Sequence, residues 1–119
     1  MNILVLEAST TSAKAMLYDT DTGKFDVKSR AYTGNYEDVT MHKADNVYEQ
    51  MIALGREVAA GHEISMISLS GTWHSLFLCD QDMKPVTPVY LWSYTGAAEV
   101  CKELREDPEY VKWFYNKTG

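Results

Sequence analysis

The first third of the chain alternates between short apolar runs and polar turns, which is the pattern of antiparallel strands. Residues 3–6 (ILVL) contain no polar side chain, as is typical of a strand covered on both faces. Residues 13–19 and 24–32 predict two further strands, and the polar sequence TDTG at 20–23 between them predicts a tight turn. Three strands joined by short turns predict a meander at the start of the fold.

Helical spacing follows a polar, irregular stretch at residues 33–44. Apolar residues then recur every three or four positions from 47 to 58, which predicts an amphipathic helix with one face on the core. Asn46 and Glu49 have the spacing of a capping box at the helix start, and Gly61 is placed to end the helix.

The second half of the chain predicts shorter elements. Residues 65–70 (SMISLS) and 75–80 (SLFLCD) are short apolar runs that predict two more strands, with GTWH as the loop between them. Residues 89–94 are expected to be extended or irregular, and residues 96–106 to form a helix. A last helix is expected to begin at Pro108, because proline is favoured at the first helical position.

The predicted order of elements is β-β-β-α-β-β-α-α. Three antiparallel strands followed by a helix and a further strand are the opening of a ribonuclease-H-like, or actin-like ATPase, domain. We therefore expect the α/β class: a mixed five-stranded sheet with flanking helices, forming an incomplete first domain over residues 1–119. No linker, internal repeat or low-complexity tract divides the chain, and the apolar side chains of its last helix would need a partner to cover them.

Composition and charge exclude several classes of protein. The chain has 119 residues, of which 45% are hydrophobic, and a net charge of −6, so it is a poor ligand for the phosphate backbone of nucleic acids. No apolar run approaches the roughly 18 residues that span a bilayer, and the N-terminus lacks the basic start of a signal peptide. We expect neither a nucleic-acid nor a membrane partner, and a cytoplasmic location.

The segment LEASTTSAK at residues 6–14 gathers polar groups where the first strand ends. A turn rich in serine and threonine offers backbone N–H and hydroxyl donors that converge on an anion such as phosphate. Lys14 adds a positive charge, and Glu7 is a carboxylate of the kind that holds Mg²⁺, often through water. The residues alone leave two interpretations open: a nucleotide phosphate site, or a polar turn with one exposed ion pair.

Three segments together resemble the FGGY family of carbohydrate kinases. Residues 7–14 (EASTTSAK) are similar to the family's first phosphate motif, Asp-x-Gly-Thr-(Thr/Ser)-Ser-x-(Arg/Lys). Residues 67–80 (ISLSGTWHSLFLCD) resemble its strand–loop–strand segment with a Met-His pair, and residues 88–92 (PVYLW) its Pro-x-x-x-Trp segment. The order and distances match, so the resemblance implies the N-terminal part of the first, sugar-binding domain of a gluconate kinase or xylulokinase-like protein.

The resemblance implies transfer of the γ-phosphate of ATP, with Mg²⁺, to a hydroxyl of a sugar or sugar acid such as gluconate or a pentulose. Glu7 stands in the place of the family's metal-associated aspartate. The residues implied to contact the phosphates of ATP are Thr10, Thr11, Ser12 and Lys14. The residues implied to line the sugar pocket are Thr72, Trp73, His74 and Trp92.

No catalytic residue is expected within residues 1–119, because in the family the catalytic base and the adenine site lie further along the chain. We therefore expect these residues alone to be inactive and to need the remainder of their own chain as a partner; a homodimer is an open alternative. Four residues depart from the family pattern and leave open whether activity is lost or retuned: Glu7 for Asp, Ser9 for Gly, and Tyr94 and Gly96 for an Asp and an Arg.

Structural roles are the alternatives for individual residues. His74 is also consistent with a histidine bonded to the backbone between two buried strands, and Trp92 with a core residue after an apolar run. His42 and His62 have no evident partners and are expected at the surface.

Two other functional classes stay open. A ribonuclease-H-like nuclease would use clustered carboxylates, with Glu7 and Asp80 as candidates, but it leaves the STTS sequence unexplained. A non-catalytic binding module of the actin-like superfamily is favoured if the gene encodes only about these 119 residues.

Overall fold

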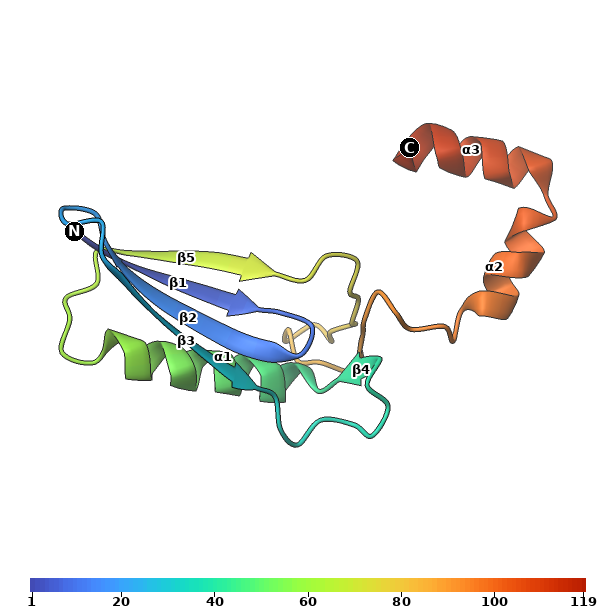
Figure 1. Ribbon diagram of the computed structural model, residues 1–119. Helices are drawn as coiled ribbons and strands as arrows, with labels where there is room; N and C mark the ends of the chain where they lie inside the picture. The colour runs from blue at the N-terminus through green and yellow to red at the C-terminus, as the bar shows by residue number, and fades with distance from the viewer.

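The computed structural model describes residues 1–119 and is built on a four-stranded mixed sheet with one long helix against one face (Figure 1). The strand order is β3-β2-β1-β5; β1, β2 and β3 pair antiparallel, and β5 pairs parallel with β1. A separate two-stranded sheet joins β4 and β6. The elements are β1 Asn2–Ala8, β2 Ser12–Asp19, β3 Phe25–Ala31, β4 Met41–His42, α1 Ala44–Ala59, β5 Met66–Gly71, β6 Val89–Tyr90, α2 Ala98–Arg105 and α3 Pro108–Thr118.

The predicted meander is confirmed, and its turns have simple local causes. Between β2 and β3, the carboxylate of Asp19 accepts hydrogen bonds from the backbone N–H of Asp21 and the hydroxyl of Thr22. Such side-chain-to-backbone bonds are how aspartate closes a turn. These bonds also hold the pKa of the Asp19 carboxyl below its usual range, the Thr22 hydroxyl contributing most.

Helix α1 begins at Ala44, earlier than the capping box predicts, and the capping box itself is wrong. The N-cap position is occupied by Lys43, whose side chain makes no capping bond. The amide of Asn46 instead donates to the carbonyl of Thr33, so a contact with the distant 33–35 segment replaces the local cap. The C-terminal prediction holds, because Gly61 has a φ of +80° just beyond the helix.

The core lies between α1 and the strands β1 and β2. Leu4 and Leu6 on β1 and Leu54 and Val58 on α1 are buried together with the small residues Ala13 and Ala15 of β2. Alanine on β2 lets the helix approach the sheet closely. The closest approach is at Gly55, where an added Cβ would lie 2.6 Å from a methyl carbon of Leu6.

An ion-pair cluster fixes the outer strand to α1. The Glu57 carboxylate accepts bonds from Lys28 at 2.9 Å and from Arg30 at 2.6 Å, both on β3. The bond from Lys28, followed by that from Arg30, holds the pKa of Glu57 below its ordinary value of 4.5. Charged side chains therefore link the exposed strand β3 to the helix.

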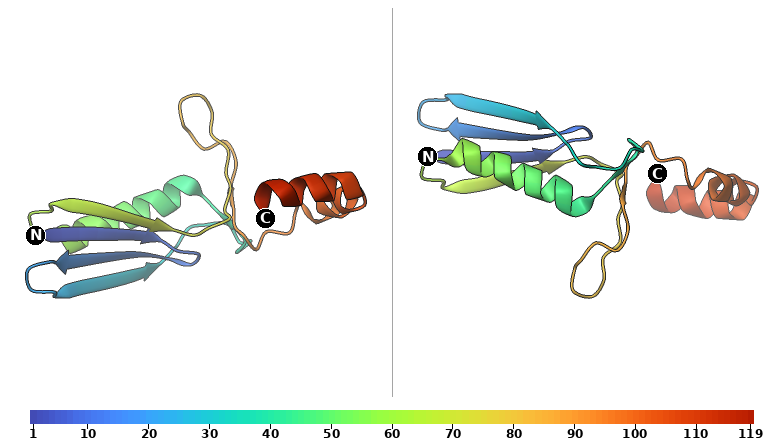
Figure 2. Two further views of the ribbon diagram at one scale, coloured as in Figure 1. Left: turned by 90° about the horizontal axis from the view of Figure 1, so that it is seen from above. Right: turned by 90° about the horizontal axis from the view of Figure 1, so that it is seen from below.

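The expected fifth strand is not formed, so the prediction of a five-stranded sheet is wrong for these residues. Residues 75–80 make isolated bridges only, Leu76 with Tyr90 and Cys79 with Pro85. The segment folds back on itself as a hairpin-like excursion that projects from the body in both views of Figure 2. The backbone of this segment pairs within the excursion, and its apolar side chains Leu76, Phe77 and Leu78 stay largely exposed.

The sheet and the C-terminal helices expose far more surface than a closed domain does. The radius of gyration is 18.6 Å, against about 13–14 Å for a compact domain of this length. The accessible surface is 8855 Å², against about 6,500 Å² for a folded monomer of this mass. Every residue of β5 is exposed, including Ile67 and Leu69.

Helices α2 and α3 stand apart from the sheet at the C-terminal end of the molecule (Figure 1). The predicted start at Pro108 is confirmed, and the Asp107 carboxylate caps the helix by accepting from the backbone N–H groups of Glu109 and Tyr110. Tyr110 is half-buried, and Trp113 and Phe114 expose much of their rings, as the sequence predicts for a helix without its partner.

None of the helices combines the length and the hydropathy that a membrane span requires.

Candidate functional site

The turn at residues 9–12 is the tight connection between β1 and β2. The backbone N–H of Ser9 donates to the carbonyl of Ser12 at 3.0 Å, and the Ser9 hydroxyl donates to the same carbonyl at 2.8 Å. The two serine hydroxyls also lie 3.1 Å apart. Serine side chains thus brace the turn from within, and they leave the tip to Thr10 and Thr11, whose hydroxyls make no hydrogen bond within the chain.

Serine at position 9, where the family has glycine, is compatible with the backbone conformation of the turn. A glycine at this position of the motif would permit a positive φ, but the only non-glycine residues with positive φ are His74 and Met83. Ser9 therefore needs no backbone conformation that a side chain disfavours, and its hydroxyl contributes two contacts to the turn.

Glu7 and Lys14 lie directly opposite each other on β1 and β2, next to this turn. The Lys14 Nζ is 3.1 Å from a carboxylate oxygen of Glu7, and the two side chains are 42% and 36% exposed. Two charges in this position are accessible to a ligand at the 9–12 turn. Without such a ligand the two charges neutralise each other. This is the arrangement expected if the segment is only a polar turn with one exposed ion pair.

The loop at residues 71–75 leaves the end of β5, and the sheet places it beside the 9–12 turn. Strands β1 and β5 are parallel neighbours, with Glu7 opposite Ser70 in the register. The backbone N–H and the hydroxyl of Thr72 both donate to the carbonyl of Ala8, at 3.1 and 3.2 Å, although the two residues are 64 positions apart. The carboxyl ends of adjacent parallel strands are where open α/β sheets bind ligands.

The three remaining residues predicted for a sugar pocket have exposed side chains. Trp73 is 80% exposed and Trp92 is 63% exposed, and His74 is also exposed. Within residues 1–119, neither His74 nor Trp92 is buried as the structural alternative for each would require. The imidazole of His74 packs edge-on against the Trp73 indole, with ring centroids 6.1 Å apart.

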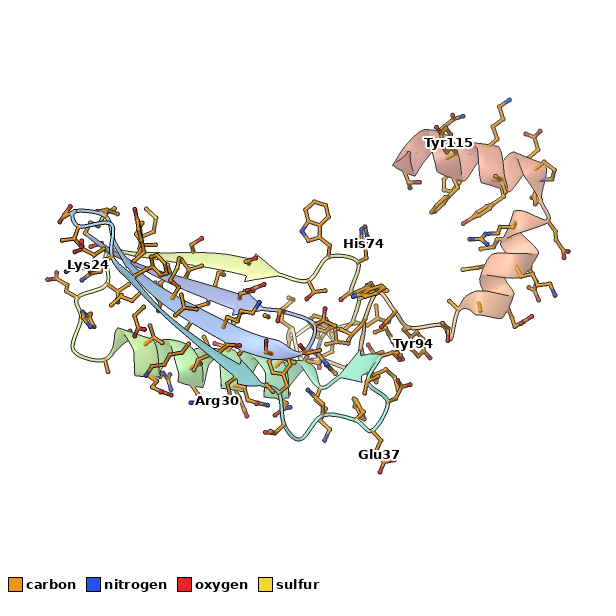
Figure 3. The ribbon with its side chains drawn as sticks, in the orientation of Figure 1. Lys24, Arg30, Glu37, His74, Tyr94 and Tyr115 are labelled. Atoms are coloured by element: carbon orange, nitrogen blue, oxygen red, sulfur yellow. The ribbon has the colours of Figure 1, made fainter.

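His74 has an unusual backbone conformation, with a φ of 60°. Positive φ is uncommon for a residue with a side chain and costs free energy, so it persists only where the surrounding structure imposes it. The bridge between Leu76 and Tyr90 follows directly after this residue and holds the loop against the segment that carries Trp92. Figure 3 shows His74 and Tyr94 at the same end of the sheet, opposite Lys24.

Tyr94 and Gly96, which both differ from the family pattern, are in contact with each other. The rings of Tyr90 and Tyr94 pack with centroids 4.6 Å apart. A Cβ atom at position 96 would collide with the hydroxyl oxygen of Tyr94, so the tyrosine lies against a backbone that only glycine leaves free. An uncharged aromatic pair replaces the charged side chains of the family pattern here.

His42 and Tyr32 lie near the candidate site, although no pattern in the sequence marks them. His42 is only 8% exposed, so the expectation of a surface position is wrong, whereas His62 is exposed as expected. Burial lowers the pKa of His42, and the Tyr32 ring packs edge-on against the imidazole at 5.3 Å. Burial, followed by the charge of Glu7, raises the pKa of Tyr32 to about 12. No local signal marks His42, since its burial comes from β6 and α1.

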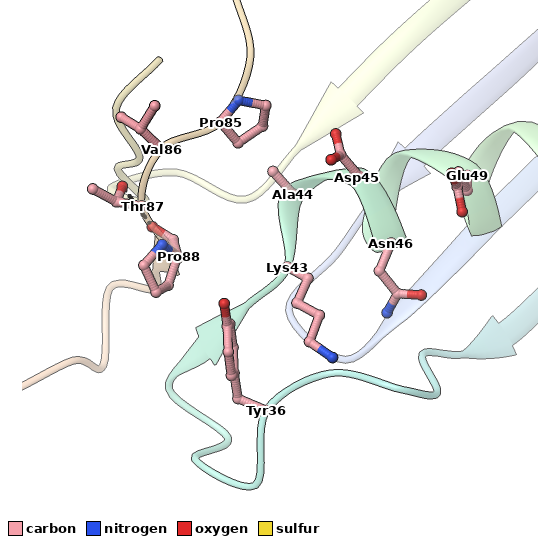
Figure 4. Close-up of a pocket in the computed structure, with 10 residues that line it drawn as sticks. All are labelled: Tyr36, Lys43, Ala44, Asp45, Asn46, Glu49, Pro85, Val86, Thr87 and Pro88. Carbon is pink, nitrogen blue, oxygen red and sulfur yellow. Dashed lines mark hydrogen bonds between the residues drawn. The ribbon is translucent and has the colours of Figure 1, made fainter. Parts of the chain in front are cut away.

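A pocket of about 480 Å³ at the start of α1 contains none of the predicted site residues. Figure 4 shows residues 85–88 facing Lys43, Asp45 and Glu49 across it. Its one cationic group is already engaged, because the Lys43 ammonium donates to the carbonyl of Gly34 at 2.9 Å. The pocket is an open surface depression beside the candidate site.

The residues near the 9–12 turn could bind Mg²⁺ only together with the phosphates of a bound nucleotide. No group of three or more histidine, cysteine, aspartate or glutamate side chains is arranged to hold a metal ion. Mg²⁺ commonly keeps several waters and binds one or two carboxylates together with the phosphates of its substrate. Glu7 supplies one such carboxylate at the edge of the 9–12 turn, so it fits this mode and not a protein-only metal site.

The structure is an α/β fragment of the actin-like ATPase fold, and its 9–12 turn and 71–75 loop lie at the ends of neighbouring parallel strands. Residues 2–119 match the N-terminal domain of the FGGY family of carbohydrate kinases. This chain belongs to that family.

Curated and solved relatives agree with this assignment. The glycerol kinase of Clostridium botulinum (strain Eklund 17B / Type B) is 23% identical over 125 residues, covering 98% of this chain. The structure of xylulose kinase from Lactobacillus acidophilus matches 99% of the chain with a TM-score of 0.85 and 20% identity, and that of gluconate kinase from the same organism matches 97% with a TM-score of 0.77 and 20% identity. At this identity the structures establish the fold alone.

The chain spans about a quarter of the length of its relatives: 25% of the glycerol kinase and of the xylulose kinase, and 24% of the gluconate kinase. The large exposed surface of β5, α2 and α3 is in keeping with that fraction.

Proposed function

We propose that this chain provides the phosphate turn and the sugar-binding loop of an ATP-dependent kinase that phosphorylates a hydroxyl of a sugar or sugar acid, of the gluconate or pentulose type. The observation that carries the proposal is the juxtaposition of the 9–12 turn and the 71–75 loop at the ends of two adjacent parallel strands. A kinase needs its two substrates side by side, and this arrangement supplies one loop for each.

On the nucleotide side, the unpaired hydroxyls of Thr10 and Thr11 and the Ser12 end of the turn would donate to phosphate oxygens. Lys14 would exchange the carboxylate of Glu7 for phosphate, and Glu7, thereby released, would hold Mg²⁺ through water. Mg²⁺ supplies charge neutralisation on the β- and γ-phosphates when bound. The ion pair at 3.1 Å keeps both charged side chains at the turn before a nucleotide arrives.

On the sugar side, Trp73 and Trp92 would present flat apolar faces to the C–H bonds of the sugar, and His74 would exchange hydrogen bonds with its hydroxyls. Thr72 would form the pocket wall, since its own hydroxyl is used in the bond to Ala8. The strained backbone of His74 supports this role, because such strain is found where a side chain must be held for binding. Met83, at the tip of a turn, also has a positive φ. The positive φ of His74 therefore supports a binding role only because His74 also lies in the loop beside the 9–12 turn.

The catalytic base and the adenine site are proposed to come from the remainder of the polypeptide, which would also cover the open face of β5 and the α2–α3 unit. The nuclease alternative lacks a carboxylate cluster, because no group of three or more histidine, cysteine, aspartate or glutamate side chains is arranged to hold a metal ion. Asp80 helps to close the 80–84 turn, where its Oδ1 accepts from the backbone N–H groups of Asp82 and Lys84. A measurement of phosphate transfer by the complete polypeptide distinguishes the kinase from the non-catalytic binding module.

The test is turnover of ATP with a panel of polyols, ketoses and aldonates, comparing purified residues 1–119 with the complete polypeptide. We expect no turnover by residues 1–119 and turnover by the complete polypeptide with at least one sugar or sugar acid. Turnover by residues 1–119 alone would refute the proposal that the catalytic base lies outside these residues. A complete polypeptide that binds ligands but transfers no phosphate would favour the non-catalytic module.

A further inference from the structure

The face of the sheet opposite α1 is uncovered, and its last row of side chains before the 9–12 turn is polar. Leu4 and Leu6 of β1 are buried against α1, so the alternate residues Ile3, Val5 and Glu7 point to the opposite face. No helix lies against that face (Figures 1 and 2). The strand register aligns one residue of each strand with Glu7, which gives the row Ser70, Glu7, Lys14 and Ser29.

Ser70 flanks Glu7 on the side away from Lys14. Strand β1 lies between β2 and β5, and Glu7 is opposite Lys14 on the first neighbour and opposite Ser70 on the second. Adjacent strands are about 4.8 Å apart, so a glutamate side chain can reach either neighbour. The Glu7 carboxylate lies 3.1 Å from the Lys14 Nζ. The Ser70 side chain is exposed, and its hydroxyl makes no hydrogen bond within the chain.

The other hydroxyl groups at this edge of the sheet are already engaged. The Ser9 hydroxyl donates to the carbonyl of Ser12 and lies 3.1 Å from the Ser12 hydroxyl. The Thr72 hydroxyl donates to a backbone carbonyl of β1 at 3.2 Å. Ser70 is therefore the hydroxyl donor beside Glu7 that neither the fold nor the proposed phosphate contacts use.

We propose that Ser70 is a positioning residue for Glu7: its hydroxyl donates to the Glu7 carboxylate when the Lys14 ammonium leaves Glu7 for a phosphate group. This inference rests on the proposed function of the 9–12 turn. An ammonium group neutralises the carboxylate with which it pairs, whereas a hydroxyl is an uncharged donor and leaves the full negative charge in place. Ser70 would hold one oxygen of Glu7, and the other oxygen would stay free for the water shell of a bound cation.

The contact matters because a glutamate side chain is flexible. The Glu7 side chain is 36% exposed, so without a partner its carboxylate is free to move among several rotamers. Serine has a short side chain on the backbone of β5, and a hydrogen bond from it would restrict the carboxylate to the edge of the 9–12 turn. The loss of one such bond is expected to change rates about two- to tenfold.

The first test is structural and uses neither nucleotide nor sugar. Lys14→Met in the complete polypeptide removes the ammonium group, as phosphate binding would. In a crystal structure of this variant we expect an oxygen of the Glu7 carboxylate about 2.5–3.0 Å from the Ser70 Oγ. A Glu7 carboxylate that is bonded to another group, or to solvent alone, would overturn the proposal.

The second test measures turnover by the complete polypeptide with Mg²⁺ varied. Ser70→Ala should lower kcat about two- to tenfold and raise the Mg²⁺ concentration for half-maximal rate, with the KM for sugar and the melting temperature little changed. Ser70→Thr keeps the hydroxyl and should restore the parental values. Ser68→Ala is the matched control, because Ser68 is exposed on the same face of β5 but lies opposite Val5.

A double-variant cycle separates an effect through Glu7 from an independent one. In a Glu7→Ala background, Ser70→Ala should cause no further loss of kcat, and a loss as large as in the parent would contradict the proposal. A kinase that is active and indifferent to Ser70→Ala refutes the role of Ser70 and leaves the proposed function standing. An inactive complete polypeptide refutes the proposed function, and the Lys14→Met structure then decides separately whether Ser70 holds Glu7.

Discussion

Lys14→Met separates the chemistry of the 9–12 turn from the stability of the fold. The substitution removes the ammonium group and keeps most of the apolar stem, so the packing of β2 is retained. Lys14 is paired with Glu7 at 3.1 Å and is 42% exposed. If the turn binds the phosphates of ATP, the ammonium group of Lys14 attracts the nucleotide. If the turn is only structural, the ammonium group interacts with Glu7 alone.

The structure predicts different magnitudes for the two cases. An exposed ion pair stabilises a fold by about 0–1 kcal/mol, so the melting temperature should fall by only a few degrees. A unit charge about 4 Å from a phosphate oxygen is worth about 4 kcal/mol at an effective dielectric constant of 20. Solvent exposure and the loss of the Glu7 contact on nucleotide binding reduce this figure. We expect a net loss of at least about 1.4 kcal/mol, or tenfold in kcat.

The assay is ATP turnover by the complete polypeptide at saturating sugar, with thermal unfolding followed on the same preparations. Glu7→Gln, which removes the carboxylate charge at nearly constant shape, should also lower kcat at least tenfold, and Glu7→Asp should preserve or raise it. Lys24→Met is the matched control, because Lys24 is an exposed lysine at the opposite end of the sheet (Figure 3). The double variant Glu7→Gln with Lys14→Met turning over ATP at the parental rate would refute the phosphate role.

Three further variants test the site and the fold. His74→Ala in the complete polypeptide should raise the KM for sugar or lower kcat/KM by about two- to tenfold with the KM for ATP unchanged; lost thermal stability at an unchanged sugar KM would instead indicate a structural residue. Gly55→Val should lower the free energy of unfolding in urea by about 1–3 kcal/mol, because its first carbon would lie 2.6 Å from Leu6, whereas Ala53→Val on the exposed side of α1 should cost less than about 1 kcal/mol. Because the folded pKa of Glu57 is lowered, its stabilising effect should be present above pH 4.5 and disappear as the pH falls through the folded pKa, and Glu57→Gln should remove that acid dependence from urea midpoints.

Local patterns in the sequence determined the elements whose stabilising contacts are also local. The β1–β2–β3 meander follows from apolar runs separated by turn residues, and α1 from apolar spacing that ends at Gly61. The start of α3 follows from Asp107 and Pro108, since both act on the first turn of their own helix. The motif residues of the two loops were found for the same reason: each motif is a short contiguous segment.

Only the tertiary structure decided where distant segments meet. Parallel pairing of β1 with β5 brings Ala8 and Thr72 into contact, and that pairing depends on a crossover through α1 that no short window of sequence encodes. His42 is covered by segments on both sides of it in the sequence, since its strand pairs with β6 at Val89 and its ring packs against Tyr32. The apolar run at 75–80 has the composition of a strand, but it pairs within its own excursion because Leu76 meets Tyr90. Hydrophobic pattern specifies that a segment is to be covered, whereas the partner that covers it is fixed by the three-dimensional path of the chain.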